Sequence, residues 1–284
     1  MSLLRILRHD INDGIIKNWY KWLLCIIAFV LMCYNCYRIT YGFSMGIFFD
    51  VNTEIIHMWI MKGRWPYHYD PNFRETFTVP FEWIFLYVML AFIIGNYIRQ
   101  DMEGYGRLMM VQAGSRRTWW LSKTIWVVIV NVLFWGMLWI TEIIFCYFKC
   151  TVVDNQSVKY FIREYFRDIY DKTDKMYLIV LFLLPVLVGI VQSILQIIVS
   201  IIANGELSFA VVSILLIVSS YYSNKFVFHG YSMVQRYCIN DRYPDDVVLD
   251  EKFGLIYLIV LILVLAFVGL KMVSNLNLLE NNKD

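Results

Sequence analysis

Polar side chains at helical spacing inside apolar stretches are the residues of this chain best placed to do chemistry. Gln192, Gln196 and Ser200 repeat every four residues, and Asn131 and Glu142 are eleven residues apart. Each set therefore lies on one face of a helix. Polar groups facing lipid are costly, so both faces should turn toward the protein interior or another subunit. They either line a path for a polar substrate or hold helices together through hydrogen bonds.

Catalytic signatures are scarce in the sequence. It contains no GxxxxGK[ST] phosphate loop, no HExxH and no GxSxG, so we expect neither nucleotide hydrolysis nor these hydrolase chemistries. The two acids within apolar stretches are Glu82, near the start of its stretch, and Glu142, close enough to an end to snorkel. His57 and His68 have no third ligand at metal spacing and are predicted to be surface histidines. We expect no cofactor or metal in this chain.

The stretches that must position these residues are long and apolar. Of 284 residues, 60% are hydrophobic, which is more than a soluble domain of this length can bury. A membrane-crossing helix needs about 20 mostly apolar residues, and the alternation typical of membrane β-strands is absent. The candidate stretches are roughly 22–39, 80–98, 119–148, 176–203, 207–224 and 254–272. The predicted fold is an all-α integral membrane protein with six transmembrane helices in a single domain, residues 1–284.

Shorter helices are predicted around these stretches. Residues 1–18 form an amphipathic helix expected to lie on the inner membrane surface. Its apolar stripe consists of Leu4, Leu7, Ile11 and Ile15, with Arg5, Arg8 and Asp13 away from it. Residues 51–63 predict another short helix. Pro185 and Gly189 predict a kink in the fourth stretch, and residues 203–206 a tight turn.

A short basic segment, residues 99–123, separates the second and third stretches. Gly114 is suited to end a short helix and Ser115 to cap the next one. The apolar residues before them, including Leu108 and Met109, form a surface suited to a soluble partner, unless the helix only rests on lipid. Five aromatic residues are expected at membrane interfaces, namely Trp19, Tyr20, Trp22, Trp119 and Trp120.

The charge pattern orients the chain. Six spans place both termini on one side, and the loops on that side are the more densely basic. Basic residues favour the cytoplasmic side, so both termini are predicted to be cytoplasmic. The formal charge of +2 is spread over many loops and gives no case for nucleic-acid binding.

The basic segment resembles the loop between the second and third helices of ABC-2 type transporter permeases, the transmembrane subunits of bacterial ABC exporters. The family pattern is an acid, a glycine-containing turn, a leucine-rich short helix, a glycine with a Ser-Arg pair, an aromatic residue and a lysine. The matching residues are Glu103, Gly106, Leu108, Gly114, Ser115, Arg116, Trp119 and Lys123. The six-span plan, the amphipathic N-terminal helix and the stretch HGYSMVQR at 229–236 also fit this family.

The resemblance implies an export permease in the bacterial cytoplasmic membrane. It would pair with a second permease copy or paralogue on separate ATP-binding subunits, which bind ATP and Mg and hydrolyse the ATP, so this chain would not be an enzyme. A short cytosolic coupling helix would dock on the ATPase. The implied docking residues are Glu103, Tyr105, Gly106, Arg107, Leu108, Met109, Gly114, Ser115 and Arg116.

The sequence also suggests a class of cargo and leaves two alternative functions open. Antimicrobial peptides or drugs are the expected cargo, because the predicted outer surface is rich in aromatic residues. The residues that would line their path are Asn131, Glu142, Gln192, Gln196 and Ser200. The alternatives are a membrane sensor or scaffold and an intramembrane enzyme. The enzyme is disfavoured because the spans lack paired acids or histidines.

Overall fold

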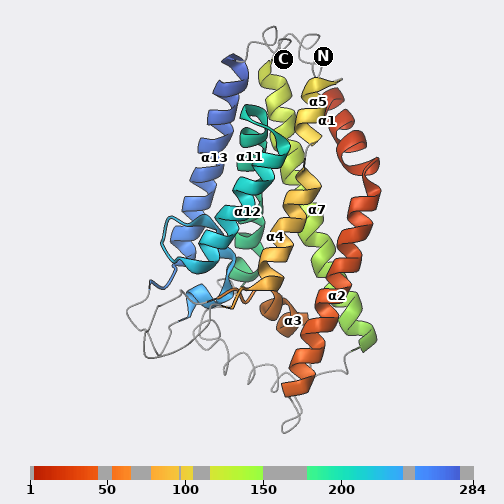
Figure 1. The fold of residues 1–284 in the computed structure, drawn as a ribbon, viewed down its shortest axis with the longest axis vertical. Helices are drawn as coiled ribbons and strands as arrows, with labels where there is room; N and C mark the ends of the chain where they lie inside the picture. Colours follow the sequence, from red (N-terminus) through yellow and green to blue (C-terminus); the bar gives the residue numbers. More distant parts are fainter. Residues whose placement is uncertain are drawn as a thin grey trace.

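The chain folds into a bundle of helices. The computed structural model describes residues 3–43, 53–64, 78–95, 97–104, 116–149, 178–238 and 247–275. Within these ranges all regular elements are helices and no strand occurs, which confirms the all-α class for the described part (Figure 1).

Four helical segments are long and apolar enough to cross a membrane. They are α2 (Trp19–Phe43), α7 (Arg116–Lys149), α13 (Glu251–Asn275), and the pair formed by η2 (Ile179–Leu183) and α11 (Leu184–Ile202). Their hydropathy and length indicate a membrane protein, as the sequence predicts.

Two further apolar helices are shorter than the sequence led us to expect. They are α4 (Phe81–Ile94) and α12 (Gly205–Tyr221). The stretch 80–98 is not continuous, because α4 ends at Gly95 and the chain resumes as α5 (Tyr97–Glu103). Gly95 has a φ of +40°, a conformation that residues with a Cβ rarely adopt. A helix of 14 residues rises only about 21 Å.

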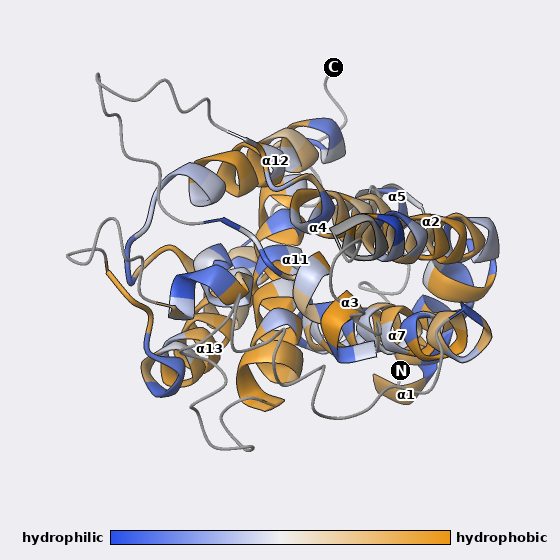
Figure 2. Cartoon of the chain, turned by 90° about the horizontal axis from the view of Figure 1, so that it is seen from below, coloured by the Kyte–Doolittle hydropathy of each residue, from blue (hydrophilic) through white to orange (hydrophobic). Residues whose placement is uncertain are grey.

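Helix α11 lies at the centre of the bundle. Viewed along the bundle in Figure 2, it is surrounded by α4, α7, α12 and α13, and it contacts all four. In the most apolar 18-residue part of the η2–α11 segment 67% is buried, against 17% in that of α13. Side chains of α13 such as Leu263 and Phe267 remain exposed, as expected for a helix that faces lipid.

One end of the bundle carries the start of α1 (Leu3–Ile11) and the end of α13, and we call it the terminal end (Figure 1). A π-helical segment, η1 (Asn12–Ile16), connects α1 to α2. At this end Arg116 of α7 donates a hydrogen bond to the carbonyl oxygen of Ser274 at 2.9 Å. The start of α7 is thereby tied to the last turn of α13.

The opposite end, which we call the α3 end, is covered by short helices. One is α3 (Thr53–Ile60), which confirms the short helix predicted within 51–63. The others are the 3-10 turns η3 (Phe228–Ser232) and η4 (Val234–Tyr237). The backbone N–H groups of Val234 and Gln235 donate to the carbonyl oxygens of Met61 and Lys62, each at 3.0 Å. The two covering segments therefore support each other.

The tight turn predicted at 203–206 agrees with the structure. The Asn204 side chain accepts a hydrogen bond from the backbone N–H of Leu207 at 2.6 Å and caps α12, which closes the turn predicted at 203–206. The kink predicted at Pro185 and Gly189 stays a prediction, and Pro185 is the second residue of α11, which follows the π-helical η2. The helix changes its hydrogen-bond pattern here because proline has no N–H to donate.

Three of the five aromatic residues predicted at membrane interfaces are buried instead. Trp22, Trp119 and Trp120 are 8%, 0% and 3% exposed, whereas Trp19 and Tyr20 lie on the surface as expected. The indole N–H groups of the α7 tryptophans bond to other helices, which favours burial of the whole ring.

The face of α1 that packs into the bundle is not the apolar stripe that the sequence predicts on the membrane surface, and that membrane contact stays a prediction. Ile6, Asp10 and Gly14 are buried at successive helical turns, while Leu4 of the expected stripe is 76% exposed. Gly14 permits close packing, because a Cβ there would lie 2.7 Å from the Trp126 ring nitrogen. The buried carboxylate of Asp10 is accommodated by the partners described below.

Candidate functional site: a buried charge cluster at the terminal end

A group of charges at the terminal end, which we call the terminal cluster, consists of His9, Asp10, Asp13, Lys17, Asp101 and Lys123. Its buried centre is Lys123. Its side chain is inaccessible to solvent, and its Nζ forms ion pairs with Asp10 and Asp101, the latter at 2.6 Å. The same Nζ lies 4.9 Å from the ring centre of Tyr97 and 5.2 Å from that of Trp119. A buried ammonium group costs several kcal/mol unless it is paired and hydrogen-bonded, and here both conditions are met.

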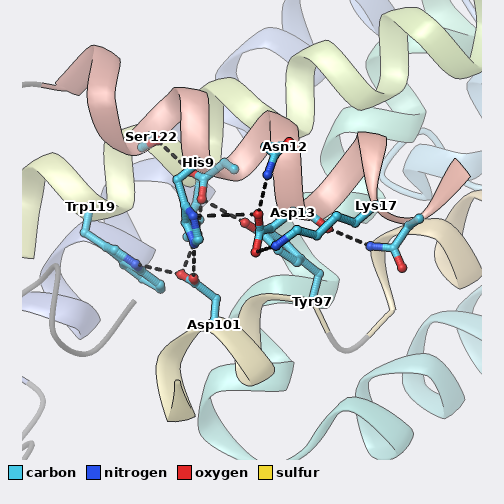
Figure 3. A network of polar contacts seen from close by, with 11 residues as sticks. His9, Asn12, Asp13, Lys17, Tyr97, Asp101, Trp119 and Ser122 are labelled. Atoms are coloured by element: carbon cyan, nitrogen blue, oxygen red, sulfur yellow. Dashed lines mark hydrogen bonds and ion pairs between the residues drawn. The ribbon is translucent and has the colours of Figure 1, made fainter. Parts of the chain in front are cut away.

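Each carboxylate of the terminal cluster has additional hydrogen bonds. Asp10 accepts from the Tyr97 hydroxyl at 2.9 Å and from the Ser122 hydroxyl at 2.6 Å. Figure 3 shows Asp101 reached by two rings, the Trp119 indole N–H at 3.2 Å and His9 Nε2 at 3.3 Å. Such charge-assisted bonds compensate the removal of the carboxylates from water.

The cluster extends toward solvent along α1 and η1. Asp13 contacts Lys17 at 2.8 Å and His9 Nδ1 at 3.8 Å. Partial burial works against ionisation of Asp13, but hydrogen bonds from Lys17 and Asn12 hold its pKa below the ordinary value. The cluster thus contains three carboxylates, of Asp10, Asp13 and Asp101, and two ammonium groups, of Lys17 and Lys123, with the His9 ring between Asp13 and Asp101.

The cluster fastens both ends of one chain segment. Asp101 lies on α5, just before residues 105–115, and Lys123 lies on α7, just after them. Lys123 is joined to α1 through Asp10, and Asp101 through His9. Arg116 extends the connection to α13. Because its carboxylates are paired with ammonium groups and held by neighbouring hydrogen bonds, this arrangement is suited to holding helices together rather than to proton abstraction.

The predicted docking residues fall mainly between these two attachment points. Glu103 ends α5 and Arg116 begins α7. The others lie outside the described residues: Tyr105, Gly106, Arg107, Leu108, Met109, Gly114 and Ser115. The coupling helix and its surface therefore stay predictions. Arg116 itself bonds to α13, a contact that the sequence did not suggest.

The predicted path residues on α11 bond to the backbone of α4. The side-chain amides of Gln192 and Gln196 donate to the carbonyl oxygens of Tyr87 and Ala91, both at 2.9 Å. The spacing of four residues on α11 thus matches the spacing of four on α4. Ser200 is one turn further along and is 2% exposed.

Asn131 and Gln192 add connections between other elements. Asn131 of α7 donates to the Ser193 hydroxyl of α11 at 3.1 Å. Gln192 Oε1 lies 3.0 Å from Nε2 of His229 in η3, whose Nδ1 lies 3.2 Å from the Ser219 hydroxyl. All five predicted path residues are at most 2% exposed. In this conformation Asn131, Glu142, Gln192 and Gln196 bond to other elements, whereas the buried Ser200 hydroxyl has no hydrogen-bond partner among the described residues. The five would line a path only if α4, α7 and α11 separated.

Glu142 and His57 do not behave as predicted. Glu142 is 1% exposed and does not snorkel, and His57 is likewise 1% exposed rather than on the surface. The two side chains contact each other, with His57 Nδ1 3.0 Å from Glu142 Oε1. The contact offsets the cost of burying each side chain. The sequence around either residue does not indicate this contact. His68 lies outside the described residues.

Several important residues were missed by the sequence reasoning. Asp10 and Asp101 were assigned no role from the sequence, and Lys123 was used only as part of the family pattern. One signal was available, because Asp10 lies four residues from both Ile6 and Gly14 on a face suited to close packing. Among the described residues no group of three or more His, Cys, Asp or Glu side chains is arranged so that it could hold a metal ion.

The fold and the cluster together define a helical membrane protein whose N-terminal helix is locked to both sides of an interhelical segment. The chain belongs to a family described as "Protein of unknown function (DUF2705)", whose model matches residues 72–278. The matched range includes Asp101, Lys123 and all five predicted path residues but not α1. No curated protein and no solved structure matches the chain.

Proposed function

We propose that this protein is the transmembrane permease subunit of an ATP-binding-cassette exporter in the bacterial cytoplasmic membrane, with the terminal end in the cytoplasm. It would move a peptide or amphipathic drug outward, paired with a second permease copy or paralogue. A separate subunit would bind ATP with Mg and hydrolyse it. The observation that carries the proposal is the terminal cluster, which fastens both ends of residues 105–115.

A mechanical role explains why charges are buried at this place. A segment that receives a push transmits it only if its attachments are stiff, and packed networks of ion pairs and hydrogen bonds carry such coupling. Asp101 and Lys123 are in direct contact, so a displacement of residues 105–115 would move α5 and α7 together. Asp10 would carry α1 along with them.

Docking on the ATPase is tested by co-purification. The double variant Leu108→Asp, Met109→Asp places two charges on the proposed apolar docking surface and should abolish recovery of the ATPase, because desolvating unpaired charges is costly. Leu4→Asp is the control, since Leu4 is exposed at the same end but outside the segment. It should retain the ATPase. Undiminished ATPase binding and export in the double variant would refute the docking role.

The path role is tested at Gln196, whose amide joins α11 to α4. Gln196→Leu removes one hydrogen bond of about 0.5–1.5 kcal/mol net value, so the complex should still assemble. If the helices separate during export, the polar group is needed in the open state and transport should fall much more than assembly. Equal loss of both would assign Gln196 to helix association alone.

The same purification separates the two other functional classes. A sensor or scaffold would bring down a kinase or regulator in place of an ATPase. An intramembrane enzyme would turn over a substrate without a motor subunit. Recovery of an ATPase whose activity responds to cargo supports the exporter.

A further inference from the structure

A second buried ionisable contact lies at the α3 end, remote from the terminal cluster. His57 of α3 places Nδ1 3.0 and 3.1 Å from the two carboxylate oxygens of Glu142 on α7. Its Nε2 lies 3.0 Å from the carbonyl oxygen of Leu181 in η2. The ring also stacks on Phe182, with 5.0 Å between ring centres and 2° between planes. These contacts hold the imidazole in one orientation.

The chemistry of these partners determines where protons must be. A carbonyl oxygen only accepts hydrogen bonds, so Nε2 must carry a proton and donate it to Leu181. Nδ1 faces a carboxyl group, and a bond between them requires one further proton, on either Nδ1 or Glu142. If that proton is lost, a lone pair on Nδ1 faces a buried carboxylate. The contact then becomes repulsive.

The sequence supplies a reason for His57 to bond here. Pro185 has no N–H for the carbonyl group four residues earlier in a helix, which is that of Leu181. His57 provides a donor for this carbonyl oxygen. One ring thereby joins α3 to both α7 and η2, while η4 holds the residues after α3 through two backbone hydrogen bonds.

We propose that His57 and Glu142 form a proton-binding latch that fastens α3 over this end of the bundle and releases it when the shared proton is lost. The ligand is a proton from the aqueous phase on the α3 side. This inference does not depend on the exporter function, since a sensor could use the same latch.

The surroundings of the imidazole determine the direction of the pH response. Burial disfavours the charged ring, but Glu142 and the bonds to Glu142 and Leu181 outweigh it and raise the pKa of His57 above its ordinary value of 6.5. The contribution to stability is therefore fully present below pH 6.5 and is lost as pH rises through the raised pKa.

Other ionisable groups lie on the neighbouring elements. The elements packed most extensively against α3 are α2 and α7, and His57 also contacts Leu181 and Phe182 of η2. Glu142 is the charge that acts on His57 from α7, and α2 contributes the buried thiols of Cys33 and Cys36. Glu82 of α4 acts on Cys36, and α3 itself carries Glu54. We therefore expect the pH dependence of the latch to arise from the His57–Glu142 contact, because Glu142 is a charged side chain bonded to the ring.

The matched control is Glu142→Gln. The glutamine amide is a permanent N–H donor to Nδ1 of a neutral ring, so the latch should stay closed without a titratable proton. Amide hydrogen exchange of residues 53–60 is measured in nanodiscs from about pH 6 to about pH 10 for both proteins. The ratio of their rates cancels the intrinsic pH dependence of exchange.

We expect the ratio of wild-type to Glu142→Gln exchange to be near one at the acid end and to rise about tenfold at the alkaline end. A constant ratio across the range would overturn the proposal. A second measurement needs only the wild-type fold: nitrogen NMR of the four histidines, with His57→Gln used to assign the signal. The pKa of the His57 ring should be higher than that of an exposed histidine. A pKa at or below the ordinary value would also refute the latch.

Discussion

At the scale of single residues, the structure depends on a few buried charges that have strict requirements for partners. Lys123 has two carboxylates and two aromatic rings around one ammonium group. Replacing a whole buried ion pair with apolar residues is often harmless, but removing one member leaves its partner charged in a low-dielectric site. The terminal cluster should therefore be sensitive to single changes and tolerant of balanced ones.

Lys123→Met should destabilise the protein by about 3–5 kcal/mol, because Asp10 and Asp101 lose their buried counter-ion. The thermal unfolding midpoint in detergent measures the loss. Lys17→Met is the control, since Lys17 is 64% exposed in its pair with Asp13 and such pairs contribute less than about 1 kcal/mol. Adding Asp10→Asn and Asp101→Asn to Lys123→Met should recover part of the loss. Equal effects of the two lysine variants would show that the cluster does not stabilise the fold.

At the scale of elements, α11 organises the bundle through close contacts with α4 and α7. Gly189 sits at this crossing, and a Cβ there would lie 2.4 Å from Asn131 Oδ1 and 3.0 Å from a methyl carbon of Leu90. The crossing also carries the bonds from Gln192 and Gln196 to α4. Small residues allow such approach between membrane helices.

Gly189→Ala should therefore destabilise the bundle by about 1–3 kcal/mol, because the added methyl group overpacks the crossing. Gly136→Ala on α7 is the matched control, since a Cβ there meets no atom within 4 Å. It should be neutral or stabilise α7 by up to about 1 kcal/mol, the helix-propensity difference between the two residues. Thermal unfolding of both variants tests this, and the prediction fails if Gly189→Ala is the more stable of the two.

At the scale of the whole molecule, the two ends have different structures. The terminal end holds the start of α1, the end of α13 and the terminal cluster, whereas the α3 end is covered by α3, η3 and η4 (Figure 1). The exporter proposal requires the terminal end to face the cytoplasm, where an ATPase would be found.

Thiol labelling of intact cells tests this orientation. Leu4 and Phe226 are 76% and 69% exposed, the first at the terminal end and the second beside the start of α13, where its carbonyl oxygen accepts a bond from Tyr257. A membrane-impermeant maleimide should label Phe226→Cys and not Leu4→Cys, compared with the unsubstituted protein as background. The reverse pattern would place the terminal end outside and exclude docking on a cytoplasmic ATPase.

Hydropathy and spacing alone were enough to predict the class of the fold and most of its helices. In a bilayer each backbone polar group must be satisfied within its own segment, so length and hydropathy indicate a helix without reference to partners. The turn at 203–206 was also predictable, because Asn204 caps α12 by accepting a hydrogen bond from Leu207, only three residues further along the chain. The faces of Gln192, Gln196 and Asn131 followed from helical periodicity.

Only the tertiary structure decided which charges are buried and what they contact. Asp10 and Lys123 are 113 residues apart, and His57 and Glu142 are 85 residues apart. Periodicity describes one helix at a time, so the sequence predicted a surface position for His57 and snorkelling for Glu142, where packing brings the two side chains together. The break at Gly95 was missed for a similar reason, since the apolar run continues through a residue whose backbone conformation is set by the fold. Burial of a charge is least costly beside a partner of opposite charge. Residues far apart in the sequence become such partners only when the helices pack.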